Sequence, residues 1–93
     1  MPYVEWDLEK SKKLLDERGV SFNDILTALG EGKLIMIDQN PAKDRIHQFM
    51  LVVEIGGYVY TVPFIDDGEK WFLKTIVPSR KYTKKYLTNK KRL

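Results

Sequence analysis

The residues best suited to chemistry lie at the C-terminal end of the chain. From Ser79 to Leu93 there are seven basic residues and no acidic one, whereas the remaining residues carry nine bases and thirteen acids. The net charge of +3 therefore comes entirely from this segment. Its bases are Arg80, Lys81, Lys84, Lys85, Lys90, Lys91 and Arg92. A basic segment that also carries tyrosines suits a polyanion whose bases can stack, which favours RNA or another nucleic acid. The alternative is a solvated terminal helix with a lysine-rich end.

The element that must position these residues is a helix that starts at a proline. Pro78 disfavours helical geometry at Val77, so a strand ends there and Pro78 or Ser79 opens the helix. Residues four apart share a face of such a helix. The pairs that do so are Arg80 with Lys84, Lys81 with Lys85, and Tyr82 with Tyr86.

Length and composition limit the possible classes of protein. Ninety-three residues form one small domain, residues 1–93, with about 88–93 as a frayed basic tail. The absence of cysteine excludes disulfides and a cysteine nucleophile, and a single histidine leaves little for zinc. We therefore expect no metal and no cofactor. The start of the chain does not resemble a signal peptide and the apolar runs are too short to span a bilayer, so a cytoplasmic protein is expected.

Two helices are predicted in the first third of the chain. A short strand at residues 3–6 precedes Asp7, which is a suitable N-cap for a helix reaching Glu17 or Arg18. Gly19 suits the left-handed stop after that helix. Ser21 then begins a second helix, with Asp24 three residues on for a capping box, and this helix is expected to close at Gly30.

Four strands are predicted next, over residues 33–38, 48–55, 58–65 and 71–77. Gly56-Gly57 permits the positive φ values of a two-residue hairpin turn. Counting back from that turn pairs four sets of apolar residues on one face: Ile55 with Tyr58, Val53 with Tyr60, Leu51 with Val62, and Phe49 with Phe64. Pro63 cannot donate a ladder hydrogen bond to its other neighbour, so a bulge or a strand end is expected there. Asp66-Asp67-Gly68 predicts a turn rather than a cation site.

This order of elements predicts an α+β domain. The N-terminal strand and two helices pack on one face of an antiparallel sheet of four to five strands, and the basic helix ends the chain. The opposite face of the central hairpin is mixed in character, so that a helix or a partner could cover it.

Two separated motifs resemble one family. The opening Trp6-Asp7 with Lys10, followed by Arg18 to Phe22, is similar to the start of BrnT-type toxins, W-D-x-x-K and then K-H-G-[VL]-x-F. The stretch from Ile76 to Tyr86 resembles that family's I-S-x-R-x-A-x-x-x-E-x-x-x-Y ending, with Arg80 on the arginine. Arg18 replaces the usual histidine, and Tyr86 or a lysine stands where a glutamate is usual. The motifs therefore place no histidine or carboxylate as general base.

The resemblance implies a RelE/ParE-like toxin of a type II toxin–antitoxin module. Such proteins are small α+β domains that cleave RNA and are neutralised by an antitoxin with a DNA-binding part. Metal-independent cleavage needs a base for the 2′-hydroxyl, charge stabilisation at phosphorus and an acid for the 5′-oxygen, and a lysine serves as base where neighbouring cations lower its pKa. The residues expected to be catalytic are Arg80, Lys10, Lys74, Arg18 and Tyr86, and those expected to bind RNA are Lys81, Lys84, Lys85 and Tyr82.

Two other functions fit the same residues. A toxin of this fold can poison a topoisomerase without cleaving RNA, and a non-catalytic nucleic-acid-binding module needs only the basic surface. For the toxin, the expected partners are a cognate antitoxin, which is a DNA-binding repressor that forms a hetero-oligomer with it, and an RNA substrate; no membrane is expected.

Overall fold

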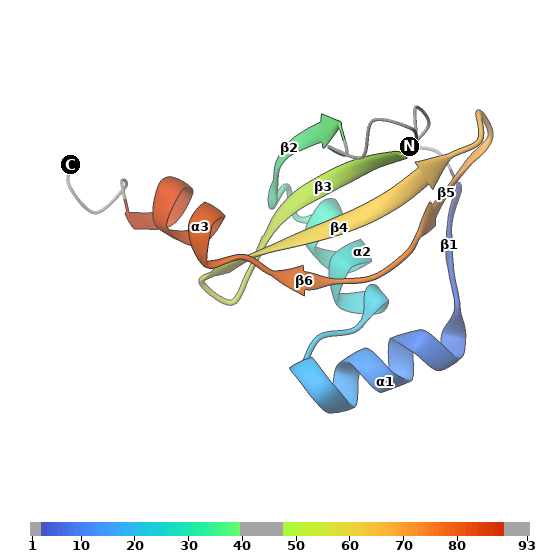
Figure 1. Cartoon of the computed structure of the whole chain (residues 1–93), viewed down its shortest axis with the longest axis horizontal. Helices are drawn as coiled ribbons and strands as arrows, with labels where there is room; N and C mark the ends of the chain where they lie inside the picture. The colour runs from blue at the N-terminus through green and yellow to red at the C-terminus, as the bar shows by residue number, and fades with distance from the viewer. Residues whose placement is uncertain (1–2, 40–47, 89–93) are drawn as a thin grey trace.

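The computed structural model of the chain describes residues 3–39 and 48–88 (Figure 1). The sequence predicts a turn at Gln39-Asn40-Pro41 and a loop over 42–45. Residues 40–47, which include the single histidine His47, and residues 89–93 lie outside the described ranges. The described elements, in order, are β1 (Tyr3–Trp6), α1 (Leu8–Arg18), α2 (Phe22–Gly30), β2 (Leu34–Gln39), β3 (Gln48–Ile55), β4 (Tyr58–Asp66), β5 (Lys70–Leu73), β6 (Val77–Pro78), α3 (Arg80–Thr83) and the π-helix η1 (Lys84–Thr88).

The two N-terminal helices begin at the predicted caps. The Asp7 side chain accepts hydrogen bonds from the first-turn amides of α1, and Gly19 ends that helix with φ of 73°. Ser21 and Asp24 form the reciprocal capping box of α2. The helix α2 ends at Gly30 as predicted, and the positive φ of 75° falls two residues later, at Gly32. These caps satisfy amides that would otherwise lack partners at the helix ends.

The sheet is mixed rather than wholly antiparallel. Within the described ranges its strand order is β1-β5-β4-β3-β2, with β6 paired to β4 beyond the end of β5. The strand β1 runs parallel to β5, whereas the pairs among β2 to β6 are antiparallel. The strand β1 forms one edge of the sheet and is followed directly by α1. Its partner β5 comes much later in the chain, after α2 and the strands β2 to β4. The predicted α+β class is confirmed and the purely antiparallel sheet is wrong.

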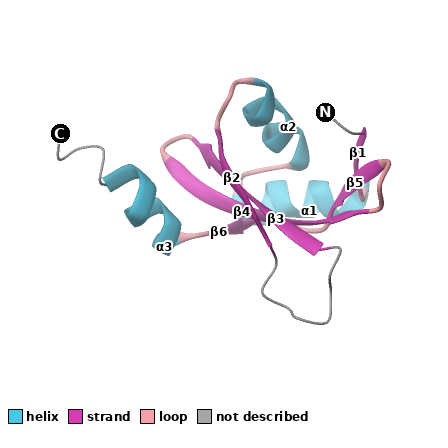
Figure 2. Cartoon of the chain, turned by 90° about the horizontal axis from the view of Figure 1, so that it is seen from above, coloured by secondary structure: helices cyan, strands magenta, loops and turns pink. Residues whose placement is uncertain are grey.

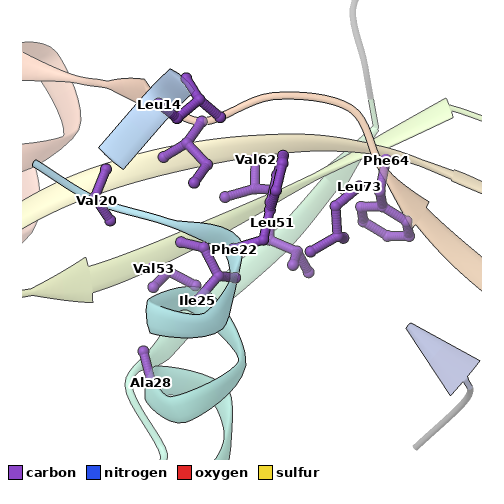
Figure 3. Packing of buried hydrophobic residues seen from close by; sticks show 11 residues of the cluster. Leu14, Val20, Phe22, Ile25, Ala28, Leu51, Val53, Val62, Phe64 and Leu73 are labelled. Carbon is purple, nitrogen blue, oxygen red and sulfur yellow. The ribbon is translucent and has the colours of Figure 1, made fainter. Parts of the chain in front are cut away.

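The central hairpin has the predicted register. Gly56 and Gly57 both have positive φ, 59° and 81°, and the four predicted apolar pairs of β3 and β4 face one another. We call the sheet face that carries Leu51, Val53, Val62 and Phe64 the first face. These side chains pack against α1 and α2 through Leu14, Phe22 and Ile25, as Figure 3 shows. The first face is therefore the main core of the domain.

The last strand is interrupted opposite Pro63, so a single strand over 71–77 is wrong. Leu73 pairs with Phe64, but Val77 pairs with Thr61, so the register shifts by one residue between β5 and β6. The Lys74 amide still donates to the Pro63 carbonyl at 2.8 Å, whereas the proline nitrogen has no hydrogen to return. Two residues, Thr75 and Ile76, therefore lie opposite Val62 alone, which is the bulge predicted at Pro63.

The bulge decides which side chains enter the core. Strand side chains alternate between faces, so residues three apart, such as Leu73 and Ile76, should point to opposite sides. Both are nevertheless buried in the same cluster, because the extra residue resets the alternation. Val77 then points to the other side and is 40% exposed.

The cap at Ser21 provides a direct test of the helix start. Replacing Ser21 by Ala removes the acceptor for the Asp24 amide and the hydroxyl bound to the Asp24 carboxylate. We expect the free energy of unfolding to fall by about 1 kcal/mol, measured by chemical denaturation. The control Asn23→Ala, at an exposed position in the first turn of the same helix, should change it by less than about 0.5 kcal/mol. Equal effects of the two substitutions would contradict the capping role.

Candidate nucleic-acid interface

The basic helix α3 begins directly after β6, the short strand that follows the bulge. Ser79 is the N-cap of α3, and its hydroxyl accepts from the Tyr82 amide at 3.1 Å. The helix continues directly into η1, so residues 80–88 form one short rod. On it Tyr82 and Tyr86 stack, with ring centroids 5.8 Å apart and planes 24° from parallel. The predicted helix start and the shared tyrosine face are confirmed.

This helix is held on the side of the sheet away from the main core. We call the sheet face that carries Val52, Val59 and Thr61 the second face. Val52 and Val59 are fully buried but do not belong to the first-face cluster. The tyrosine hydroxyl of Tyr86 donates to the sulfur of Met36, which pairs with Val52 across β2 and β3. Figure 2 shows α2 and α3 on opposite sides of the β3–β4 hairpin.

Three hydrogen bonds fix the start of the helix on β4. The Ser79 amide donates to the Val59 carbonyl at 2.9 Å, and the Val59 amide donates to Thr83 Oγ1 at 2.9 Å. The Thr83 hydroxyl in turn donates to the Ser79 carbonyl at 2.7 Å. The Thr83 side chain thus accepts the hydrogen bond of the Val59 amide, which a backbone carbonyl of a neighbouring strand would accept in a continuous sheet. The basic segment up to Leu87 is docked rather than detached from the domain.

Docking divides the helix into two sides. Tyr82, Thr83, Tyr86 and Leu87 are half-buried toward the sheet. The exposed bases are Arg80, Lys81, Lys84 and Lys85, which we call the basic helix surface. The Lys85 ammonium also lies 5.3 Å from the centre of the Tyr86 ring. The helix therefore presents its cations to solvent on one side and its two tyrosines toward the sheet, and Lys85 lies over one of the rings.

The structure does not bring all the predicted catalytic residues together. Lys74 lies opposite Pro63, so alternation places it on the second face, the face on which α3 docks. Lys10 is in the first turn of α1, in the layer that packs on the first face. It lies about 12 Å along the helix axis from Arg18. Lys10 is therefore not part of the candidate interface, whereas Lys74 and Arg80 share one face of the sheet.

Arg18 has a structural partner. Its Nη1 donates a hydrogen bond to the carbonyl of Ile76, one of the two residues that lie opposite Val62 in the bulge. A bulge leaves a backbone group without its ladder partner, and the guanidinium supplies one. The last residue of α1 thus ties the helix layer to the interrupted strand. Its partner Ile76 lies four residues before Arg80 in the sequence.

The acidic turn is accounted for by backbone hydrogen bonds. Asp66 Oδ1 accepts from the Gly68 amide, and Asp67 Oδ1 accepts from the Glu69 and Lys70 amides. These amide bonds, chiefly that from Lys70, lower the pKa of Asp67. Across the two described ranges no group of three or more histidine, cysteine, aspartate or glutamate side chains is placed to hold a metal ion. The interpretation of this segment as a turn is confirmed.

A cleft that was not predicted from the sequence lies beside the basic helix. Its volume is about 350 Å³, and it is lined by Gly32, Lys33, Leu34, Ile35, Glu54, Tyr86 and Leu87. The start of β2, the end of β3 and the basic helix enclose it, and Figure 1 shows these three segments at the same end of the sheet. Strand alternation along β3 indicates from the sequence that Glu54 lies on the second face. The sequence does not indicate that Tyr86 lies near it, because that position depends on how α3 docks.

Comparisons with protein-family models, with curated proteins and with solved structures found no significant match to this chain. Within residues 3–39 and 48–88, no helix is both long enough and apolar enough to cross a membrane.

The Arg18 contact can be tested by removing the guanidinium. In Arg18→Met the side chain keeps its packing length but leaves the Ile76 carbonyl without its donor. We expect the free energy of unfolding to fall by about 1–3 kcal/mol, measured by denaturation. The matched control Lys13→Met, at an exposed position of α1, should have little effect. An Arg18→Met protein as stable as the control would contradict the bridging role.

Proposed function

We propose that this protein is the toxin component of a type II toxin–antitoxin module and acts as a metal-independent endoribonuclease. The observation that carries the proposal is the docked, acid-free helix, which bears four exposed cations and two stacked tyrosines and is fixed to β4 by Ser79 and Thr83. A solvated terminal helix needs no such anchoring. A fixed array of cations can hold the phosphates of a strand whose bases stack on nearby rings.

Arg80 is the central residue of the proposed site. Its guanidinium is a planar fork suited to a phosphate, and it stands at the first position of α3, directly after the cap. Lys74 supplies a second cation on the same face of the sheet. Lys81, Lys84 and Lys85 extend the surface along the RNA backbone, and Tyr82 provides the stacking platform. Lys10 and Arg18 take no part in the chemistry.

The proposed partners follow from the charge of this surface. In the cell, an antitoxin that covers the basic helix surface with acidic residues holds the toxin inactive, and the complex is cytoplasmic. The antitoxin's DNA-binding part represses the module. These statements rest on the family resemblance of the two sequence motifs together with the exposed bases.

A second candidate function is nucleic-acid binding without cleavage. It is favoured by the position of Lys10 in the other helix layer and by the use of Arg18 at the Ile76 carbonyl, which remove two of the five residues expected to be catalytic. The two functions differ in whether purified protein alone breaks the RNA chain.

Replacement of Arg80 by Ala tests the proposal. Purified wild-type protein should cleave RNA in the presence of a chelator, and Arg80→Ala should lower kcat/KM by about 10²–10³-fold because a fixed cation no longer stabilises charge at phosphorus. Growth arrest on expression should be lost, while RNA affinity is only weakened.

The control for Arg80→Ala is Lys13→Ala, which removes one exposed charge from α1 and should leave cleavage unchanged. Binding without cleavage by the wild-type protein would favour the second candidate. Wild-type protein that neither cleaves nor binds RNA and whose expression does not arrest growth would contradict the proposed toxin.

The salt dependence of RNA binding tests the basic helix surface separately. For single strands the slope of log K against log salt concentration is about −0.7 per neutralised phosphate. Replacing Lys84 and Lys85 by Ala should therefore make the slope shallower by about 1.4. The control pair Lys12→Ala with Lys13→Ala should leave the slope unchanged. Equal changes in the two double variants would show that the contact is not localised on α3 and η1.

A further inference from the structure

The cleft beside the basic helix contains a carboxylate, that of Glu54, which has no role in the proposed function described above. Glu54 is half-buried at the end of β3, and its backbone amide donates to the Lys33 carbonyl at 3.1 Å. Among the described residues, its carboxylate makes no hydrogen bond or salt bridge. Its oxygens are not among the buried, unpartnered side-chain atoms of the described residues, so the carboxylate remains open to solvent and to a ligand in the cleft.

The groups around Glu54 are of complementary chemistry. Lys33 and Tyr86 line the same cleft, and the Lys85 ammonium lies over the Tyr86 ring. The cleft thus holds an acceptor for a proton, a hydroxyl that can donate one, and cations that favour an anion. Its volume of about 350 Å³ falls in the range of sites that hold a small ligand or part of a polymer. The basic helix surface leads directly to it along η1.

We infer that Glu54 is the general base of the proposed ribonuclease and that Tyr86 is its general acid. This inference rests on the proposed function. As the 2′-oxygen attacks phosphorus, the Glu54 carboxylate takes the proton of the 2′-hydroxyl and an O2′–P bond forms. The bond from phosphorus to the 5′-oxygen breaks, and that oxygen takes the proton of the Tyr86 hydroxyl. The products are a 2′,3′-cyclic phosphate and a 5′-hydroxyl, and solvent exchange restores both side chains.

The geometry favours Glu54 over the two lysines predicted from the sequence, Lys10 and Lys74, as the base. Lys10 belongs to the layer on the first face, and Lys74 lies near the bulge beyond β5. Neither lines the cleft among its described residues. Tyr86, in contrast, lines the cleft together with Glu54. Among the described residues its hydroxyl donates to the Met36 sulfur, a weak acceptor that an RNA oxygen can replace.

The experiment compares E54Q with the wild-type protein in single-turnover cleavage of a short RNA in the presence of a chelator. The amide has the same shape but cannot take the proton, so we expect kcat to fall by about 10²–10⁴-fold. RNA affinity should be unchanged or tighter, because a negative charge beside the phosphate is removed. Y86F should also lose kcat while keeping affinity, because it retains the ring and loses only the hydroxyl.

The matched control is E17Q, at an exposed position of α1, which should cleave like the wild-type protein. Thermal unfolding of E54Q establishes that the variant is folded, and E54D should retain part of the rate. A folded E54Q that cleaves at the wild-type rate overturns the assignment and leaves the proposed function intact. Wild-type protein that does not cleave overturns both, so the wild-type arm distinguishes the two failures.

Discussion

The missing amide hydrogen of Pro63 is the constraint on which the rest of the structure depends. Because β4 cannot donate at that position, the neighbouring strand keeps only the bond from Lys74 and then bulges. The bulge buries Leu73 and Ile76 together and leaves the Ile76 carbonyl to Arg18 at the end of α1. The bulge also determines the face of the sheet on which the chain continues after Pro78. One residue in β4 thereby couples the core, the N-terminal helix and the docking of α3.

The docked helix α3 covers the second face of the sheet. The half-buried tyrosines and Thr83 cover the apolar residues Val52 and Val59, while the bases point outward. The same contacts bring Tyr86 to the mouth of the cleft that contains Glu54. In the proposed enzyme the cations of α3 and η1 therefore hold phosphates next to the reacting groups, of which Tyr86 is on η1 and Glu54 is on β3. The helix layer on the first face serves mainly as the core.

Local signals predicted the elements better than the long-range arrangement. The caps at Asp7 and Ser21, the two-glycine turn and the hairpin register depend on residues close in sequence, and all are confirmed. The parallel pairing of β1 with β5 depends on residues about 67 positions apart, and the sequence carries no sign of it. For the site, the pairs of residues that share a face of α3 could be predicted from their spacing. The separation of Lys10 from Arg80 could not be predicted, because it depends on the face of the sheet on which α1 packs. Glu54 was missed because no motif marks it and its neighbours come from three separate segments.

The most direct measurement of the central claim is an NMR titration of the labelled protein with a short single-stranded RNA that resists cleavage through 2′-O-methyl groups. The account predicts that amide shifts concentrate on residues 79–87 and on the cleft at Lys33 and Glu54, with α1 and α2 nearly unchanged. Shifts confined to the α1 and α2 layer, or no shifts at concentrations where the RNA is in excess, would contradict the assignment of the second face as the nucleic-acid surface.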